Sequence, residues 1–355
     1  MAYGTISADV IQSSVSGVSL GAGNATVFKN RIINGDMRID QRNAGASVTP
    51  TNAQYSVDRW SAFLSQASKF TMQQNAAAVT PPVGFINYLG ITSSSAYSIA
   101  AGDYFGFRQA IEGLNIADFG WGTANAKTVT MSFQVYSSLT GTFGGVLKNS
   151  AANRSYPFTY TISSANTWTS ISITVAGDTT GTWLTTNGIG IEVAWSLGTG
   201  STYSGTAGSW SANNYVSATG ATSVVGTSGA TFYITGVQLE VGSSATGFEY
   251  VNYTNQLAMC QRYYETMGAD VTGSLLVSGN PSSAQQINTT FTYKVTKRTT
   301  PTVTKVGTWS VTNASQPIVF GPGVDSFLLY LNSTAGGASY AQNISASYIT
   351  ISAEL

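Results

Sequence analysis

Histidine is absent from the 355-residue chain, and cysteine occurs once, at Cys260. Histidine is the commonest general base and the commonest metal ligand in proteins, so its absence excludes Ser-His-Asp, Cys-His and histidine–zinc sites. A single cysteine can form neither an intrachain disulfide nor a cysteine-based zinc site. The chemistry of this chain must therefore rest on other side chains.

Charge is scarce as well: Asp, Glu, Lys and Arg make up 8% of the residues, and the formal net charge is zero. A chain without a basic surplus is poorly suited to neutralise phosphates, so we expect no nucleic-acid partner. No apolar run approaches the ~18 residues of a membrane-spanning helix, and the first residues lack the pattern of a secretory signal. We therefore expect no membrane insertion.

Aromatic residues, by contrast, make up 12% of the chain, and there are 38 glycines. This composition favours an ordered all-β protein with many turns. Residues 29–250 alternate apolar and polar positions between glycine-rich turns, which predicts a β-sandwich or jelly roll with Trp60 and Trp195 in its core. The predicted strands are Val129–Tyr136, Phe158–Ile162, Ser170–Val175, Ile189–Leu197 and Thr231–Leu239.

Residues 1–28 are small and polar, with glycines that interrupt any helix. Such a segment cannot bury a core by itself. We expect an extended arm that orders on another protein or subunit; the alternative is a terminus without fixed structure.

Residues 251–267 are predicted to be a helical linker, with its helix over 254–267 and Thr254 as N-cap. Leu257, Cys260, Tyr264 and Met267 fall on one helical stripe, which needs a partner surface and is our candidate oligomer interface. Residues 268–355 are predicted to form a smaller β-rich tip domain, with strands near Phe291–Val295, Thr308–Val311, Ser326–Leu331 and Ser345–Ala353.

Several blocks resemble a known family in content and order. They are NRIINGDMRIDQRNAG (Asn30–Gly45), YSVDRW (Tyr55–Trp60), Arg108–Phe143, Arg154–Leu184 and Thr231–Glu265, the last beginning TFYITGVQLEVG. The chain resembles phage tail-fibre and related virion proteins that carry a carbohydrate-binding-module-like jelly roll. The resemblance implies a virion surface protein, assembled as a homotrimer like the fibres of that family.

Candidate glycan-binding residues lie in the long polar loop Gly198–Gly229, which carries Tyr203, Trp210 and Tyr215. Long loops in compact domains are usually functional or disordered, and exposed aromatics often mark binding surfaces. Trp121 and Trp183, each among Gly and Thr, are weaker candidates. For every one of these rings the alternative is packing on the domain or on a subunit.

A structural calcium ion would need six to eight oxygen ligands. Asp36, Asp40 and Glu240 are the candidates, because the first and last strand regions are neighbours in such folds. The closing strand reads Ile234-Thr235-Gly236-Val237, where metal-binding relatives often carry acids, and this departure weakens the calcium hypothesis.

Glycosidases need two carboxylates that flank one bond. No spacing singles out a pair among Asp103, Glu112, Asp118 and Asp178, so we expect no enzymatic activity and no cofactor other than that calcium.

The resemblance implies a tail fibre or receptor-binding fibre that resides in the virion, and the aromatic and polar composition is compatible with attachment to a host cell-surface polysaccharide. Residues 1–28 would join it to other tail or baseplate proteins. Two alternatives stay open: a head decoration or tail-scaffold protein that binds only virion subunits, and a polysaccharide depolymerase.

Overall fold

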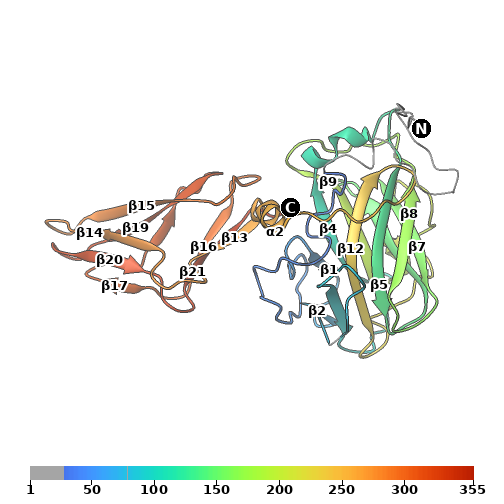
Figure 1. Ribbon diagram of the computed structural model, residues 1–355, viewed down its shortest axis with the longest axis horizontal. Coiled ribbons are helices and arrows are strands. Elements are labelled where there is room, and N and C mark those ends of the chain that lie inside the picture. Colours follow the sequence, from blue (N-terminus) through green and yellow to red (C-terminus); the bar gives the residue numbers. More distant parts are fainter. Residues whose placement is uncertain (1–27, 78) are drawn as a thin grey trace, which may run out of the picture. The chain divides into compact units, whose positions relative to one another are not determined.

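The computed structural model describes residues 28–77 and 79–355, so the predicted attachment arm, except Phe28, lies outside the described residues. The chain divides into two compact units, Met1–Tyr250 and Val251–Leu355, which are described separately (Figure 1).

Unit 1 is a jelly-roll β-sandwich of two five-stranded antiparallel sheets. The first sheet has the order β1 (Ser61–Leu64), β4 (Tyr104–Glu112), β9 (Ile189–Thr199), β6 (Gly141–Lys148), β7 (Ser155–Ile162). The second has the order β2 (Phe70–Gln74), β3 (Leu89–Ser93), β12 (Thr231–Val241), β5 (Val129–Ser137), β8 (Thr169–Val175). The predicted fold class and the five predicted strands of this region are confirmed.

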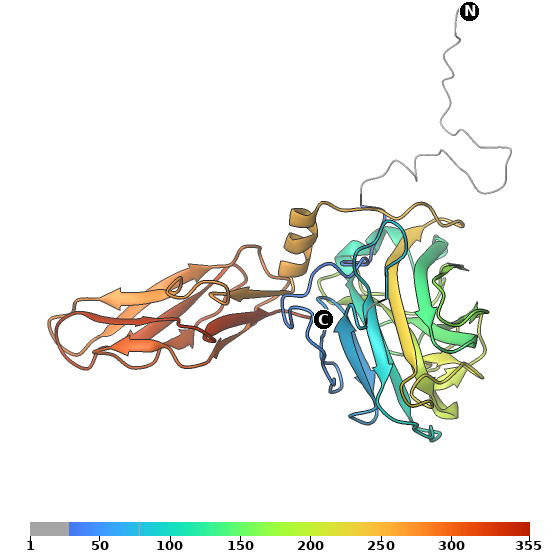
Figure 2. The same cartoon turned by 60° about the horizontal axis from the view of Figure 1, so that its bottom comes forward.

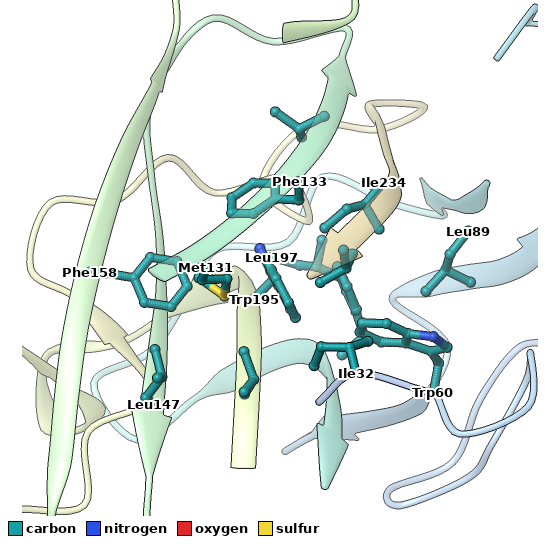
Figure 3. Packing of buried hydrophobic residues seen from close by; sticks show 14 of the residues in the cluster. Ile32, Trp60, Leu89, Met131, Phe133, Leu147, Phe158, Trp195, Leu197 and Ile234 are labelled. Carbon is teal, nitrogen blue, oxygen red and sulfur yellow. The ribbon is translucent and has the colours of Figure 1, made fainter. Parts of the chain in front are cut away.

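Alternation builds the core between the two sheets. In β9, Ile191, Val193 and Trp195 point inward and are fully buried. The ring of Trp195 stacks on Phe107 at 5.5 Å, and Trp60 lies 5.7 Å from it. Trp60 and Trp195 are therefore core residues, as predicted, and Figure 3 shows both among the aliphatic side chains that surround them.

Residues 28–30, the first that the structure describes, form hydrogen bonds with residues 246–249 near the end of unit 1. The carboxylate of Glu249 accepts hydrogen bonds from the backbone N–H of Phe28 (2.8 Å) and Asn30 (2.7 Å). The ammonium of Lys29 donates to Thr246 Oγ1 (2.6 Å) and to the carbonyl of Gly247 (2.7 Å). Residues 28–30 and 246–249 therefore lie side by side.

The long insertion 198–229 is ordered against the first sheet. It contains a 3₁₀ turn, η3 (Ser201–Tyr203), and two short parallel strands, β10 (Ser204–Gly205) and β11 (Ser217–Ala218). An isolated bridge joins it to the start of β7, and the fully buried side chains of Val224 and Val225 anchor its far end. The loop therefore has a fixed conformation over the outer face of the sheet.

Unit 2 begins with α2 (Tyr253–Gln261), the coiled ribbon in Figure 2, and continues as three three-stranded sheets. Their orders are β13 (Tyr264–Met267), β21 (Tyr348–Ser352), β16 (Thr302–Val306); β14 (Leu276–Gly279), β20 (Ser339–Gln342), β17 (Ser310–Thr312); and β15 (Gln286–Thr292), β19 (Ser326–Asn332), β18 (Ile318–Phe320). Within the described ranges no helix has the length and apolarity needed to cross a membrane.

The helix prediction was wrong beyond Gln261. Tyr264–Met267 form β13, which pairs with β21 from Tyr264↔Ser352 to Met267↔Ile349, so long-range pairing overrides the local helical spacing. The N-cap is Asn252, whose side chain accepts from the Thr254 N–H at 2.9 Å, and not Thr254 itself.

Candidate functional site

A pocket of about 180 Å³ opens between the outer face of the first sheet and the insertion 198–229. Strands β1, β4, β6 and β9 supply its floor, and the insertion supplies one wall. Its lining consists of Asn52, Phe63, Tyr104, Arg108, Lys148, Glu192, Ala194, Tyr203, Asn214 and Val216. Because most of these side chains stand on paired strands, the pocket is largely preformed.

Three aromatic rings form the apolar side of this pocket. Phe63 and Tyr104 stack with ring centroids 6.2 Å apart, and Tyr203 meets Tyr104 edge-on at 5.2 Å. The Phe63 ring lies across β4 at Gly106, where an added Cβ would lie 2.3 Å from it. Glycine at position 106 therefore allows the ring to pack flat against the sheet.

Three charged groups form the polar side. Arg108 Nη1 donates to Glu192 Oε2 at 2.8 Å, and Lys148 Nζ lies 3.4 Å from the same oxygen. Lys148 and Glu192 are direct partners in the β6–β9 pairing. All three side chains are mostly covered, with 8–23% of their surface exposed, so their charges are held in a partly dry environment.

Of the predicted loop aromatics, only Tyr203 lines the pocket. Tyr215 packs over Gly205, where an added Cβ would lie 2.3 Å from its ring, and its hydroxyl accepts from Asn213 Nδ2 at 2.9 Å. It therefore supports the loop that carries Tyr203 and Asn214.

Trp121, Trp183 and Trp210 meet in one cluster away from the pocket lining. Their centroids are 4.8 to 5.3 Å apart in edge-to-face pairs, and Tyr156 of β7 adds a fourth ring. Trp121 and Trp183 are each 6% exposed, so their ring faces are occupied by other aromatics. Trp210 is half-buried and donates to the carbonyl of Ala176 at 2.8 Å. The cluster fastens the insertion to the sandwich.

An ion pair sits beside this tryptophan cluster. Arg154 Nε and Nη2 donate to the two carboxylate oxygens of Asp178 at 2.6 and 2.8 Å. Burial by itself would raise the pKa of Asp178, but the hydrogen bonds from Arg154 and Thr180 outweigh it and lower that pKa. The same hydrogen bond raises the pKa of Arg154.

The three calcium candidates each serve local structure. Asp36 pairs with Arg38, Asp40 accepts the backbone N–H groups of Asn43 and Gly45, and Glu240 accepts from Gln238 and Thr246. Over residues 28–77 and 79–355, no three His, Cys, Asp or Glu side chains gather as a metal cluster would require. The calcium hypothesis gains no support from this arrangement.

The other carboxylates considered for glycosidase chemistry also lie outside the pocket lining. Asp103 accepts from Ser65 and Tyr97, and Asp118 pairs with Arg31. Glu112 is 1% exposed at the end of β4. Among the described residues, Glu192 is the single carboxylate on the lining.

The candidate oligomer stripe is not continuous. Cys260 is fully buried and Met267 is 9% exposed, while Leu257 and Tyr264 are half-buried on different elements. Met267 packs in the core of unit 2. The stripe therefore stabilises its own unit in large part.

Sequence reasoning missed Phe63, Tyr104, Arg108, Lys148 and Glu192. A signal existed in the strands. Glu192 is the single charge in the otherwise largely apolar strand IGIEVAWSL, and Arg108 lies among aromatic residues in YFGFRQAIE. The sequence alone does not show that these strands are neighbours in one sheet.

Comparison with known proteins gives structural likenesses only, since no protein-family model and no curated protein matches the sequence. The enzymatically active domain of bacteriophage CBA120 tailspike protein 4 has a TM-score of 0.34 at 12% identity over 60% of this chain, and this chain spans 22% of that one. A family 4 carbohydrate-binding module (TM-score 0.31, 13% identity) is matched over 59% of this chain and 98% of its own. The family 11 module from Clostridium thermocellum, solved with a β-1,3-1,4-mixed-linked tetrasaccharide, has a TM-score of 0.28 at 11% identity, with 56% and 97% coverage. At such TM-scores these likenesses carry no functional assignment.

Proposed function

We propose that the protein is a non-enzymatic phage virion fibre protein that binds a host cell-surface glycan through the pocket on the first sheet. The observation that carries the proposal is the pairing of aromatic rings and fixed polar groups in one open, preformed pocket. The sequence resemblance to phage fibres motivates the virion location.

The chemistry of the pocket suits a sugar ring. A pyranose has apolar C–H faces and an equatorial rim of hydroxyls, so it needs an apolar ring surface beside directed hydrogen-bonding groups. The apolar ring surface is formed by Phe63, Tyr104 and Tyr203. The hydrogen-bonding groups are Arg108 and the exposed amides of Asn52 and Asn214.

Binding is favoured over hydrolysis by the number of carboxylates. A glycosidase uses one carboxylic acid and one carboxylate on opposite sides of the scissile bond. In the described part of the chain the lining has one carboxylate, Glu192, and it pairs with the two cations Arg108 and Lys148. The depolymerase alternative predicts new reducing ends when purified protein is incubated with capsular polysaccharide; we expect none.

The test is removal of one pocket ring. Tyr104→Ala and Tyr203→Ala should each weaken glycan binding about ten-fold, because a stacked ring contributes on the order of 1 kcal/mol beyond the area it buries. Tyr253→Ala is the matched control, since Tyr253 is 55% exposed and belongs to unit 2. Binding should be measured by calorimetry against a bacterial glycan panel. Unchanged affinity in both pocket variants would contradict the proposal.

Particle assembly separates this proposal from the scaffold alternative. A fibre with a damaged pocket should still assemble into particles that adsorb poorly to cells. A scaffold protein should show no adsorption defect in the same variants.

We further propose that residues 1–28 attach the protein to tail or baseplate proteins, and that the protein is a homotrimer, as its resemblance to trimeric fibres implies.

A further inference from the structure

The charges of the pocket are unequal in number. Arg108 and Lys148 approach one oxygen, Glu192 Oε2, from neighbouring strands on either side of β9. The other lining residues that the structure describes are neutral. The pocket therefore carries one positive charge in excess, although the whole chain has a formal net charge of zero.

Lys148 carries most of this excess positive charge. Its Nζ makes one ion pair, at 3.4 Å, and no hydrogen bond among the described residues. Arg108 occupies the same carboxylate oxygen at the shorter distance of 2.8 Å. An ammonium carries three donors, and its side chain here is only 12% exposed. Water at the open mouth must therefore satisfy the remaining donors when the pocket is empty.

A neutral ligand that displaced this water would leave the ammonium poorly solvated, which is costly. A ligand carboxylate would instead replace the water with a short, charge-assisted hydrogen bond. The aromatic rings would hold the sugar ring while Lys148 and Arg108 met its negative group. The register fixes this geometry, since Lys148 is opposite Glu192 and Arg108 is opposite Ala194 on the lining.

We propose that the pocket selects acidic glycans, specifically chains whose sugars carry a carboxylate, such as uronic acids. This inference rests on the proposed glycan-binding function and deepens it by naming the ligand class. Lys148 is then a specificity-determining residue, and the Phe63–Tyr104–Tyr203 surface supplies binding that does not depend on charge.

The experiment uses the full chain and paired ligands. A panel of uronate-containing oligosaccharides is compared with the same oligosaccharides after carboxyl reduction, which converts each acid into a neutral hexose without changing the linkages. The acidic form should bind about ten-fold more tightly or better, as expected for a hydrogen bond to a charged group. Raising the salt concentration should reduce that ratio.

Lys148→Gln should lower affinity for the acidic form more than for the reduced form, so that the ratio between the two falls towards one. Lys127→Gln is the matched control, because it removes the same charge from an exposed position of unit 1 outside the lining. A thermal melt of both variants checks that the sandwich is intact.

The outcomes separate the two proposals. Equal or tighter binding of the reduced glycans, or an unchanged ratio in Lys148→Gln, would overturn the preference for acidic sugars alone. Failure of every acidic and neutral glycan to bind would overturn glycan binding itself, and this inference with it.

Discussion

The ammonium of Lys297 lies 2.7 Å from the carboxylate of Glu265, and both side chains are completely buried. Lys297 also donates to the carbonyl of Gln261 at the end of α2, while Glu265 belongs to β13. This pair therefore ties the helix to the first strand of unit 2. Burial lowers the pKa of Lys297, although the hydrogen bond from Lys297 to Glu265 acts against that shift.

Lys297→Met should destabilise unit 2 by about 3–5 kcal/mol, because it leaves a buried carboxylate without its partner. Chemical unfolding followed by Trp309 fluorescence measures this, since Trp309 belongs to unit 2. The double variant Lys297→Met, Glu265→Leu should recover much of the loss. A single variant as stable as the parent would show that water reaches Glu265.

The Arg154–Asp178 pair predicts a dependence of stability on pH. The folded-state pKa of Asp178 is lowered, so the contribution of the pair is fully present above the unfolded-state pKa of about 3.9. It is lost as the pH falls through the lower folded-state value. Asp178→Asn should therefore destabilise the protein at pH 7 and flatten the decline in melting temperature below pH 4.

The matched control is Asp270→Asn at an exposed position. It removes the charge of an exposed carboxylate and should leave the melting temperature at pH 7 close to that of the parent. An Asp178→Asn variant with the parent's acid profile would contradict the assignment.

Trp210→Ala should lower both stability and glycan affinity. The ring packs on Trp121, Trp183 and Tyr156, so its removal should cost about 2–4 kcal/mol, near the range for buried aromatic truncations. Loosening the insertion would also displace Tyr203 from the pocket. Calorimetry and thermal melts measure the two effects, and weaker binding without a stability loss would instead indicate direct ligand contact by Trp210.

The trimer proposal predicts a solution mass three times the 37.1 kDa of one chain. The outer side of β18 exposes Ile318 (44%) and Phe320 (64%), which is unusual for apolar residues on a solvent-facing sheet. Phe320→Asp should lower the mass if this surface joins the subunits. Light scattering at micromolar concentration measures the mass of the parent protein and of the variant. A monomeric parent protein would contradict the trimer proposal.

The alternation of apolar and polar residues was enough to predict the sandwich, because each strand buries one face against a single core. Ile189–Leu197 illustrates this, since every second side chain in it is inward. The helix prediction failed at Tyr264 and Met267 because a stripe spaced for a helix also fits a short strand when distant residues pair with it. Ser352 pairs with Tyr264 and Ile349 pairs with Met267, both from a strand more than 80 residues further along the chain.

The site was predicted only in part for a related reason. Tyr203 stood out because it lies in a polar loop, whereas Trp210 in the same loop is a packing residue. Lys148 and Glu192 become neighbours only through the β6–β9 pairing, which local sequence does not reveal. A pocket built across four strands depends on sheet order, and periodicity carries no information about order.

The fastening of Phe28 and Asn30 to Glu249 determines how tension would pass through this protein. A pull applied between Phe28 and Tyr250 would load these hydrogen bonds and the Lys29 contacts first. The strands of the sandwich, and the pocket that they carry, would bear load only after the contacts at Glu249 had broken.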